Sequence, residues 1–247
     1  KRQILEALSH HFQAPWIVCE DIAAPYEQAH IQQLKEAQLK VQTVWQSTLM
    51  RLADLPFDVR NVPDQFTTFR QLVERPTMHV KNPLPVISAM PALPDVSGLK
   101  TPLITPIQAT GSSPTQAISI DPRSAFPWGL AGFKGGETSA LAHLAHYCSN
   151  KLPGTYKLTR NGLMGVDYST KWSPWLATGA LSPRQAWAAV KAYETLHGAN
   201  DSTYWIGFEL LWRDHFRWLH LKHGHKLYRR QGLSATTHLH TTHSAKN

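Results

Sequence analysis

Helical and strand patterns alternate over the first fifty residues of the chain. Apolar residues recur at helical spacing in residues 1–12 and 26–37, while residues 16–19 form a short apolar run and residues 40–45 alternate polar with apolar side chains. A short apolar run is typical of a buried parallel strand, and strands that alternate with helices predict βα units. Two strands are too few for an independent sheet. We therefore expect residues 1–60 to be the last part of a larger doubly wound α/β domain whose first strands precede this chain.

Proline dominates the middle of the chain. Residues 64–75 have a helical pattern that ends before Pro76, because the residue before a proline disfavours the helical conformation. Ten of the 17 prolines lie between Pro76 and Pro127, and this stretch shows little periodicity. Such a stretch typically runs over a surface as an extended connector. We therefore expect residues 61–128 to connect two domains.

Helical patterns return in residues 129–233, which we predict to be part of a mainly α-helical domain. One face of its first helix is marked by Leu141, Leu144, Ala145 and Cys148. Residues 182–185 form a capping box with proline at the first helical position. The last two helices have end signals at Gly198, at Asp201 or Ser202, and at Gly224.

Composition excludes several classes of protein. Of the 247 residues, 42% are hydrophobic and 17% are charged, which is typical of a globular protein. The formal charge of +8 favours polyanions, although it is equally compatible with a merely soluble cationic protein. Two cysteines, Cys19 and Cys148, are too few for a disulfide framework, so we expect buried thiols in a reducing compartment, the cytoplasm. No apolar run approaches the ~20 residues of a membrane span. We also expect the protein to be a monomer.

The first candidate site is the segment DYSTKWSPW, residues 167–175, which joins hydroxyl groups and a lysine just before a helix start. Such a loop offers backbone N–H groups, hydroxyl donors and a cation to a phosphate. The simpler interpretation is that Ser173 caps the helix while Ser169 and Thr170 are solvated. Spacing alone favours this simpler interpretation.

The second candidate site is the helix that contains Glu209, where large apolar residues surround one carboxylate. A carboxylate in apolar surroundings is costly unless it is paired or used. One interpretation is an i,i+4 ion pair with Arg213, worth about 0.2–0.5 kcal/mol. The other is a pocket wall, on which Trp212 stacks against a base and Glu209 accepts its hydrogen bonds. The pattern leaves these two alternatives equal.

Histidines provide a third candidate, a metal site formed by His238, His240 and His243. No helical pattern or acidic partner accompanies them, so we interpret residues 234–247, which are rich in Thr, His and Ser, as a disordered tail and predict no metal. Four further histidines on or beside the last helix are expected at the surface: His215, His220, His223 and His225.

Three long segments together resemble the flavin domain of the photolyase/cryptochrome family. They read GGETSALAHLAHY, TYKLTRNGLMGVDYSTKWSPWLATGALSPRQ and ANDSTYWIGFELLWRDHFRW. With LPFDVRNVPDQFTTFR upstream, they are most similar to the DASH branch of that family. The likeness covers residues 15–233 in the same order.

The resemblance implies a role for each residue that matches the family's motifs. Tyr156 would line the flavin cavity and Arg213 would face it. The pyrophosphate of FAD would be held by Ser169, Thr170, Lys171, Trp172 and Ser173. Glu209 would bond the bases of a pyrimidine dimer, and Trp212 would stack on the lesion.

The resemblance also implies an activity, that of a deoxyribodipyrimidine photolyase. Reduced FAD absorbs blue light and passes an electron to a cyclobutane pyrimidine dimer in DNA, which then splits. The lesion must leave the duplex stack, and this costs least in single strands, which DASH proteins are associated with. Positive charge around the cavity would follow the backbone of the DNA.

Three departures from the family pattern qualify this expectation. The acidic positions that hold a folate antenna are not clear, and Glu20 and Glu27 are the nearby candidates. The segment that follows residue 233 in similar proteins, with the flavin-ring contacts and the redox tryptophans, is not recognisable here. Part of the flavin cavity would then be left as open helix faces. We expect the family activity of a longer parent protein. The alternatives are a non-catalytic cryptochrome-like protein that binds DNA or signals light, or an inactive truncated fragment.

Overall fold

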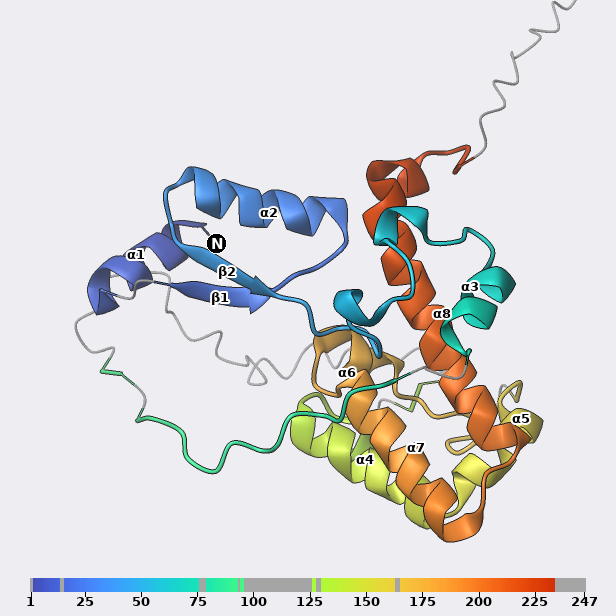
Figure 1. Cartoon of the computed structure of the whole chain (residues 1–247). Helices are drawn as coiled ribbons and strands as arrows, with labels where there is room; N and C mark the ends of the chain where they lie inside the picture. The colour runs from blue at the N-terminus through green and yellow to red at the C-terminus, as the bar shows by residue number, and fades with distance from the viewer. Residues whose placement is uncertain are drawn as a thin grey trace, which may run out of the picture.

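The computed structural model describes residues 2–13, 16–75, 79–92, 94–95, 126–127, 130–162 and 165–233. Figure 1 shows a small α/β part beside a larger group of helices around the long helix α8 (Asp201–His223). This arrangement confirms the predicted fold class, an α/β portion followed by a mainly helical one. Within the part of the chain that the structure describes, no helix has the length and apolar character to cross a membrane.

The α/β part contains α1 (Arg2–Phe12), β1 (Ile17–Glu20), α2 (Pro25–Glu36) and β2 (Val41–Val44). The two strands pair in parallel, with Ile17 opposite Val41 and Glu20 opposite Val44. A parallel pair needs a crossover connection, and α2 supplies it. The predicted βα pattern is therefore confirmed.

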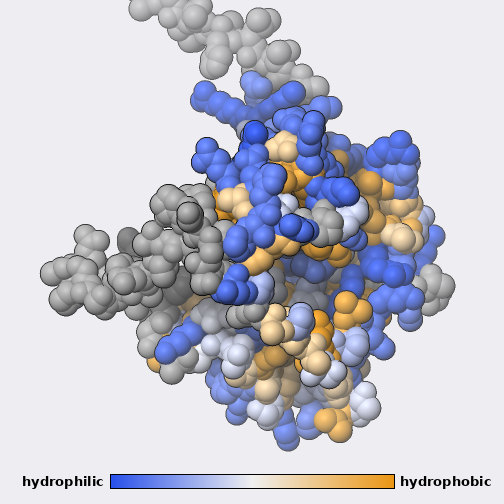
Figure 2. Space-filling view, turned by 90° about the vertical axis from the view of Figure 1, so that its left-hand side faces the viewer, coloured by the Kyte–Doolittle hydropathy of each residue, from blue (hydrophilic) through white to orange (hydrophobic). Residues whose placement is uncertain are grey.

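The prediction that the first strand is buried is wrong. Apolar residues reach the surface on the face viewed in Figure 2, and Trp16 and Val18 are 55% and 63% exposed. Val18 lies opposite Gln42 in the register, so both project from one face of the sheet. With two strands among the described residues, that face has no helix that covers it fully.

A segment of short helices leads from the sheet to the larger group. It contains η1 (Leu52–Asp54), η2 (Val59–Asn61) and α3 (Phe66–Val73). The predicted helix over residues 64–75 is confirmed, and its residues Phe66, Phe69 and Val73 are buried. They join the same hydrophobic core as residues of α8. The predicted domain boundaries at residues 60 and 128 remain predictions.

Most of the remaining elements lie around the lower half of α8 in Figure 1, and the short helix that follows α8 lies at its upper end. They are η3 (Ala131–Phe133), α4 (Glu137–Ser149), η4 (Leu152–Thr155), α5 (Tyr156–Thr159), α6 (Ser173–Thr178), α7 (Pro183–His197) and η5 (Gly224–Tyr228). Gly207 allows α7 to approach α8 closely, because a Cβ there would lie 2.4 Å from the ring of Trp187.

Local signals located the ends of α7 and α8 well. The Ser182 hydroxyl accepts from the amide of Arg184 at 3.2 Å, and the Gln185 side chain accepts from the Ser182 amide at 2.9 Å. Gly198 ends α7 as predicted. The N-cap of α8 is Asn200, whose side chain accepts hydrogen bonds from two backbone amides. Asn200 lies one position before Asp201, the earlier of the two predicted starts.

Two predictions about buried surfaces are wrong. The buried face of α4 consists of Ala140, His143, Leu144 and Tyr147, whereas Leu141 is 38% exposed. His215 is buried, not at the surface: its ring stacks on Phe69 at 4.8 Å and its Nε2 donates to the carbonyl of Pro63 at 2.7 Å. In both cases a histidine, His143 or His215, lies in the core at a position where hydropathy predicts an aliphatic side chain. The two cysteines are partly buried.

Asp214 joins the helices to the segment that follows β2. Its carboxylate is buried and accepts from the amides of Leu49 and Met50 at 2.9 and 3.0 Å. Burial of a carboxyl favours its neutral form, and it raises the pKa of Asp214 to about 7.

The raised pKa of Asp214 gives a testable prediction. Between about pH 4 and pH 7 the folded chain keeps a proton on Asp214 that the unfolded chain has lost. The group therefore stabilises the folded state fully below about pH 4, and this contribution is lost as the pH rises through about 7. Urea denaturation should show the unfolding free energy of the wild-type chain falling, relative to Asp214→Asn, across that window. A constant difference between the two proteins would contradict the prediction.

Candidate functional site

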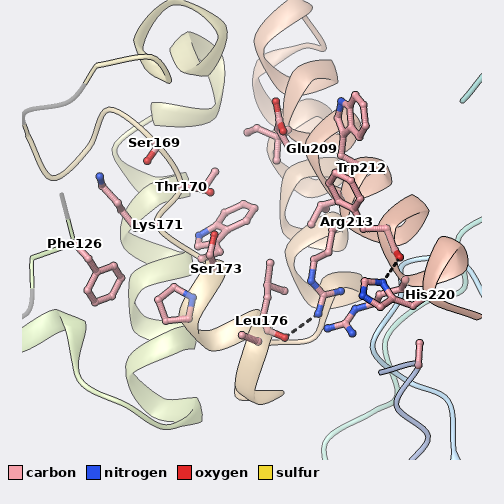
Figure 3. Close-up of a pocket in the computed structure, with 18 of the residues that line it drawn as sticks. Phe126, Ser169, Thr170, Lys171, Ser173, Leu176, Glu209, Trp212, Arg213 and His220 are labelled. Atoms are coloured by element: carbon pink, nitrogen blue, oxygen red, sulfur yellow. Dashed lines mark hydrogen bonds between the residues drawn. The ribbon is translucent and has the colours of Figure 1, made fainter. Parts of the chain in front are cut away.

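A cavity of about 920 Å³ opens between α8 and the loop that precedes α6. Figure 3 shows side chains of the loop on one side and those of α8 on the other. Every site residue predicted from the sequence lines this cavity: Tyr156, Ser169, Thr170, Lys171, Trp172, Ser173, Glu209, Trp212 and Arg213. The volume is typical of small-molecule and cofactor sites. The structure thus brings all nine residues together, while their individual roles stay predictions.

The loop wall, residues 169–173, has an unusual backbone. Lys171 has φ +56°, in the left-handed region, and Trp172 follows with φ −76° and ψ −14°. Successive residues of opposite helical hand form concave turns whose N–H groups can face an anion. The interpretation of Ser173 as a helix cap is wrong, because Ser173 is the first residue of α6 and no side chain caps that helix.

Glu209 pairs with Arg160, not with Arg213. The Arg160 guanidinium donates to the Glu209 carboxylate and lies 4.3 Å from the ring centre of Trp205. The i,i+4 interpretation of Glu209 and Arg213 is therefore wrong. Sequence reasoning missed Arg160, because 49 positions separate it from Glu209. Its position in a Tyr-x-x-x-Arg element with Tyr156, at the start of α5, was the signal that could have identified it.

Arg213 is held by main-chain oxygens. One of its nitrogens donates to the carbonyl of Leu176 at 2.8 Å, and another donates to the carbonyl of Ser47. Burial, followed by the charge of Arg217, lowers the pKa of Arg213 to about 10. Arg213 is still a cation near neutral pH, and it ties both α6 and the segment after β2 to the cavity.

Trp212 is held by an aromatic partner from the segment before the helical domain. Its ring stacks on Phe66 of α3 with centroids 3.6 Å apart and planes 11° apart, and Phe216 lies 5.5 Å away along α8. A stacked pair of this kind fixes the plane of the indole. Trp212 therefore presents an oriented aromatic surface at the cavity.

Tyr156 contributes a neutral phenol to the wall. The side chain is buried, and burial raises its pKa to about 12. It can thus donate or accept a hydrogen bond at any physiological pH without carrying charge.

The end of the cavity nearest the α/β part combines basic and acidic side chains. It is lined by Phe216, Arg217 and His220 of α8 and by Glu27 of α2. The Nε atom of Arg217 is buried and has no hydrogen-bond partner within the described residues. Of the two acidic residues considered for an antenna, Glu27 lines this cavity and Glu20 does not. Among the described residues no cluster of His, Cys, Asp and Glu could hold a metal, and the three tail histidines lie outside them.

Similarity to known proteins agrees with this geometry. No family model matched the chain. It is 42% identical to cryptochrome DASH of Danio rerio over 229 residues, which cover 87% of this chain. It is 44% identical to cryptochrome DASH of Gloeobacter violaceus over 194 residues, which cover 78% of this chain. The crystal structure of a Synechocystis cryptochrome matches 94% of the chain with a TM-score of 0.72 and 35% identity. A class III photolyase of Agrobacterium tumefaciens shares the fold, with a TM-score of 0.55 and 21% identity.

The fold is therefore that of photolyases and cryptochromes. The chain belongs to the photolyase/cryptochrome family, in its cryptochrome DASH branch. It spans less than half the length of these relatives, namely 40% and 36% of the two curated proteins and 46% and 44% of the two solved chains.

The stack of Phe66 on Trp212 gives a prediction for the cavity wall. Phe66 is 6% exposed, so Phe66→Ala leaves a void beside Trp212. Replacement of a buried aromatic ring by alanine costs about 3–5 kcal/mol, and we expect urea denaturation to show a loss of that size together with a red shift of tryptophan fluorescence. Phe66→Leu, which fills most of the volume, should lose much less. Equal stability of Phe66→Ala and the wild-type chain would contradict the stacking.

Proposed function

We propose that the cavity binds FAD and that the parent protein uses it for light-driven repair of cyclobutane pyrimidine dimers, preferentially in single-stranded DNA. One observation carries the proposal: nine residues assigned from the sequence, spread from position 156 to position 213, line one cavity. Family membership supports the same chemistry. Because the chain spans less than half of its relatives, activity, substrate and partners are proposed for the longer protein.

The residues of the cavity fit FAD. One wall offers the hydroxyls of Ser169, Thr170 and Ser173 and the cation of Lys171, which is a donor set suited to a diphosphate. Apolar side chains of α8 on the other wall, including Ile206 and Leu210, suit a flat ring. The indole Nε1 of Trp172 is buried without a partner among the described residues, so the site still has a donor to satisfy. FAD, when bound, would supply light absorption and the transferred electron.

The chain's own residues would bind and orient the two ligands. The loop of residues 169–173 would hold the diphosphate, and Arg213, fixed by two carbonyl oxygens, would add positive charge behind it. Tyr156 would provide a neutral hydrogen-bonding group. None of these groups has to change its charge for the ligand to bind near neutral pH.

On the DNA side, Glu209 and Trp212 would receive the lesion. Trp212 would stack on an unstacked base, and the Glu209 carboxylate would accept its N–H groups. Arg160 now occupies that carboxylate, so a base that bonds Glu209 has to share it with Arg160 or displace it. The charge of +8 would attract the DNA backbone.

The Arg160–Glu209 pair also favours a second function, a protein that binds DNA or signals light without repair. In that case Glu209 would remain paired with Arg160 when DNA binds, and dimers would be bound no better than intact bases.

The proposal further includes a monomer in the cytoplasm. A folate antenna is not part of the proposal.

Flavin binding can be tested on the purified chain. Lys171→Gln removes the charge and leaves a polar side chain that is one atom shorter. The dissociation constant for FAD, measured by fluorescence anisotropy, should therefore rise about tenfold, as expected for loss of a charge-assisted hydrogen bond. Lys191→Gln on α7, whose lysine pairs with Glu194 at 2.7 Å, is the matched control and should bind normally. Folded wild-type chain that retains no FAD would refute the proposed cofactor site for this chain.

The lesion contacts can be tested with short single strands that carry one thymine dimer. Trp212→Ala should weaken the preference for the dimer over the undamaged strand by about 10- to 100-fold, because stacking on an aromatic side chain contributes about 1–3 kcal/mol per base. Trp212→Phe retains a ring against Phe66 and should lose less, and Glu209→Gln should also reduce the preference. A wild-type chain without any preference for the dimer would favour the non-repair alternative.

A further inference from the structure

The inner face of α4 supports the loop wall from behind. Figure 3 shows this helix, in pale yellow-green, on the far side of the loop from α8. Three of its residues contact the loop: His143 bonds the carbonyl of Thr170 at 2.8 Å, His146 lies 3.4 Å from Asp167, and Tyr147 packs edge-on against the ring of Trp172 at 5.6 Å. Residues three and four positions apart share one helix face, so α4 acts as a single support for residues 167–172.

His143 is the most constrained of these contacts. It is 5% exposed, and its ring lies between Phe133 at 4.8 Å and Trp175 at 5.2 Å. The charged and titratable groups that face it are His146 and Tyr147 on its own helix and Asp167 from the loop. Burial lowers the pKa of His143, so the ring is neutral near neutral pH. A carbonyl oxygen only accepts, so the proton must reside on Nε2.

The bond of His143 falls at the point where the loop changes direction. Thr170, whose carbonyl it holds, immediately precedes Lys171, the residue with φ +56°. A residue with a side chain adopts this conformation only where its surroundings impose it. Trp172 follows and is 2% exposed, with its ring packed on Tyr147. The left-handed residue is thus fixed on both sides by α4.

We propose that His143 is a positioning residue of the dinucleotide site: its imidazole holds the Thr170 carbonyl and thereby keeps the turn at Lys171 in the shape that forms the cavity wall. The inference rests on the proposed FAD site. It adds a residue that is absent from the cavity lining and that acts through the backbone of the loop. His143 touches no ligand and is not a catalytic residue.

Two substitutions separate the hydrogen bond from the volume of the ring. His143→Leu fills the space between Phe133 and Trp175 without a donor, while His143→Gln retains an N–H donor of similar reach. Leu141→Ala is the matched control, because Leu141 lies on the same helix outside its buried face and is 38% exposed. All three are made in the full chain, and circular dichroism confirms their folding.

The first readout is hydrogen exchange of the amides of residues 170–173 without any ligand. His143→Leu should raise their exchange rates about tenfold, as expected for loss of one buried hydrogen bond. His143→Gln should restore most of the protection, and Leu141→Ala should change it less than threefold, as expected for a substitution at the surface. The second readout is the dissociation constant for FAD, which should rise about tenfold in His143→Leu and return toward the wild-type value in His143→Gln.

Several outcomes would overturn the inference. Unchanged exchange and FAD affinity in folded His143→Leu would do so, as would equal losses in the Leu and Gln variants, which would assign to His143 a packing role alone. If His143→Leu does not fold, ¹⁵N NMR of the wild-type chain decides, because a proton on Nδ1 instead of Nε2 is incompatible with the bond. If the wild-type chain binds no FAD, the proposed function fails for this chain, and exchange at residues 170–173 still tests His143.

Discussion

The carboxylate of Asp214, buried in the middle of α8, accepts hydrogen bonds from the backbone amides of Leu49 and Met50. The rest of the structure depends on this contact. It brings the segment after β2 against α8. From there the chain continues through η2 into α3, so that Val62, Phe66 and Phe69 enter the core. Removal of a buried acceptor leaves two amides without partners, which is one of the more costly changes a core can undergo. The α/β part, the short helices and the cavity thus share α8 as their common support.

The cavity also depends on α8. One side of α8 faces the loop before α6 and carries Glu209, Trp212 and Arg213, and each of these is fixed by a different part of the chain: Arg160 beside α5, Phe66 in α3, and Ser47 after β2 together with Leu176 in α6. The loop wall in turn rests on α4. A site assembled in this way can be precise although its loop has little regular structure, because Glu209, Trp212 and Arg213 each have a partner from another element.

Sequence reasoning succeeded where the determining signals are local. The ends of α7 follow from Ser182 and Gly198, and the parallel βα unit follows from the alternation of patterns in the first fifty residues. The nine predicted site residues line one cavity, because they belong to motifs shared with a family, while their roles stay predictions. The failures concern partners distant in sequence. Neither the stack of His215 on Phe69 nor the pair of Arg160 with Glu209 has a local signature, and the buried face of α4 includes His143, which hydropathy assigns to solvent.

The way Arg213 is held has an electrostatic consequence. Two main-chain carbonyls accept from Arg213, and a neutral carbonyl cancels none of its formal charge. Arg217, close enough to lower the pKa of Arg213, adds a second charge at the same end of the cavity. Asp214 and Glu20 act on Arg213 in the opposite sense, so the potential at this end of the cavity is a balance of two arginines against these carboxylates, and dissolved salt weakens both contributions.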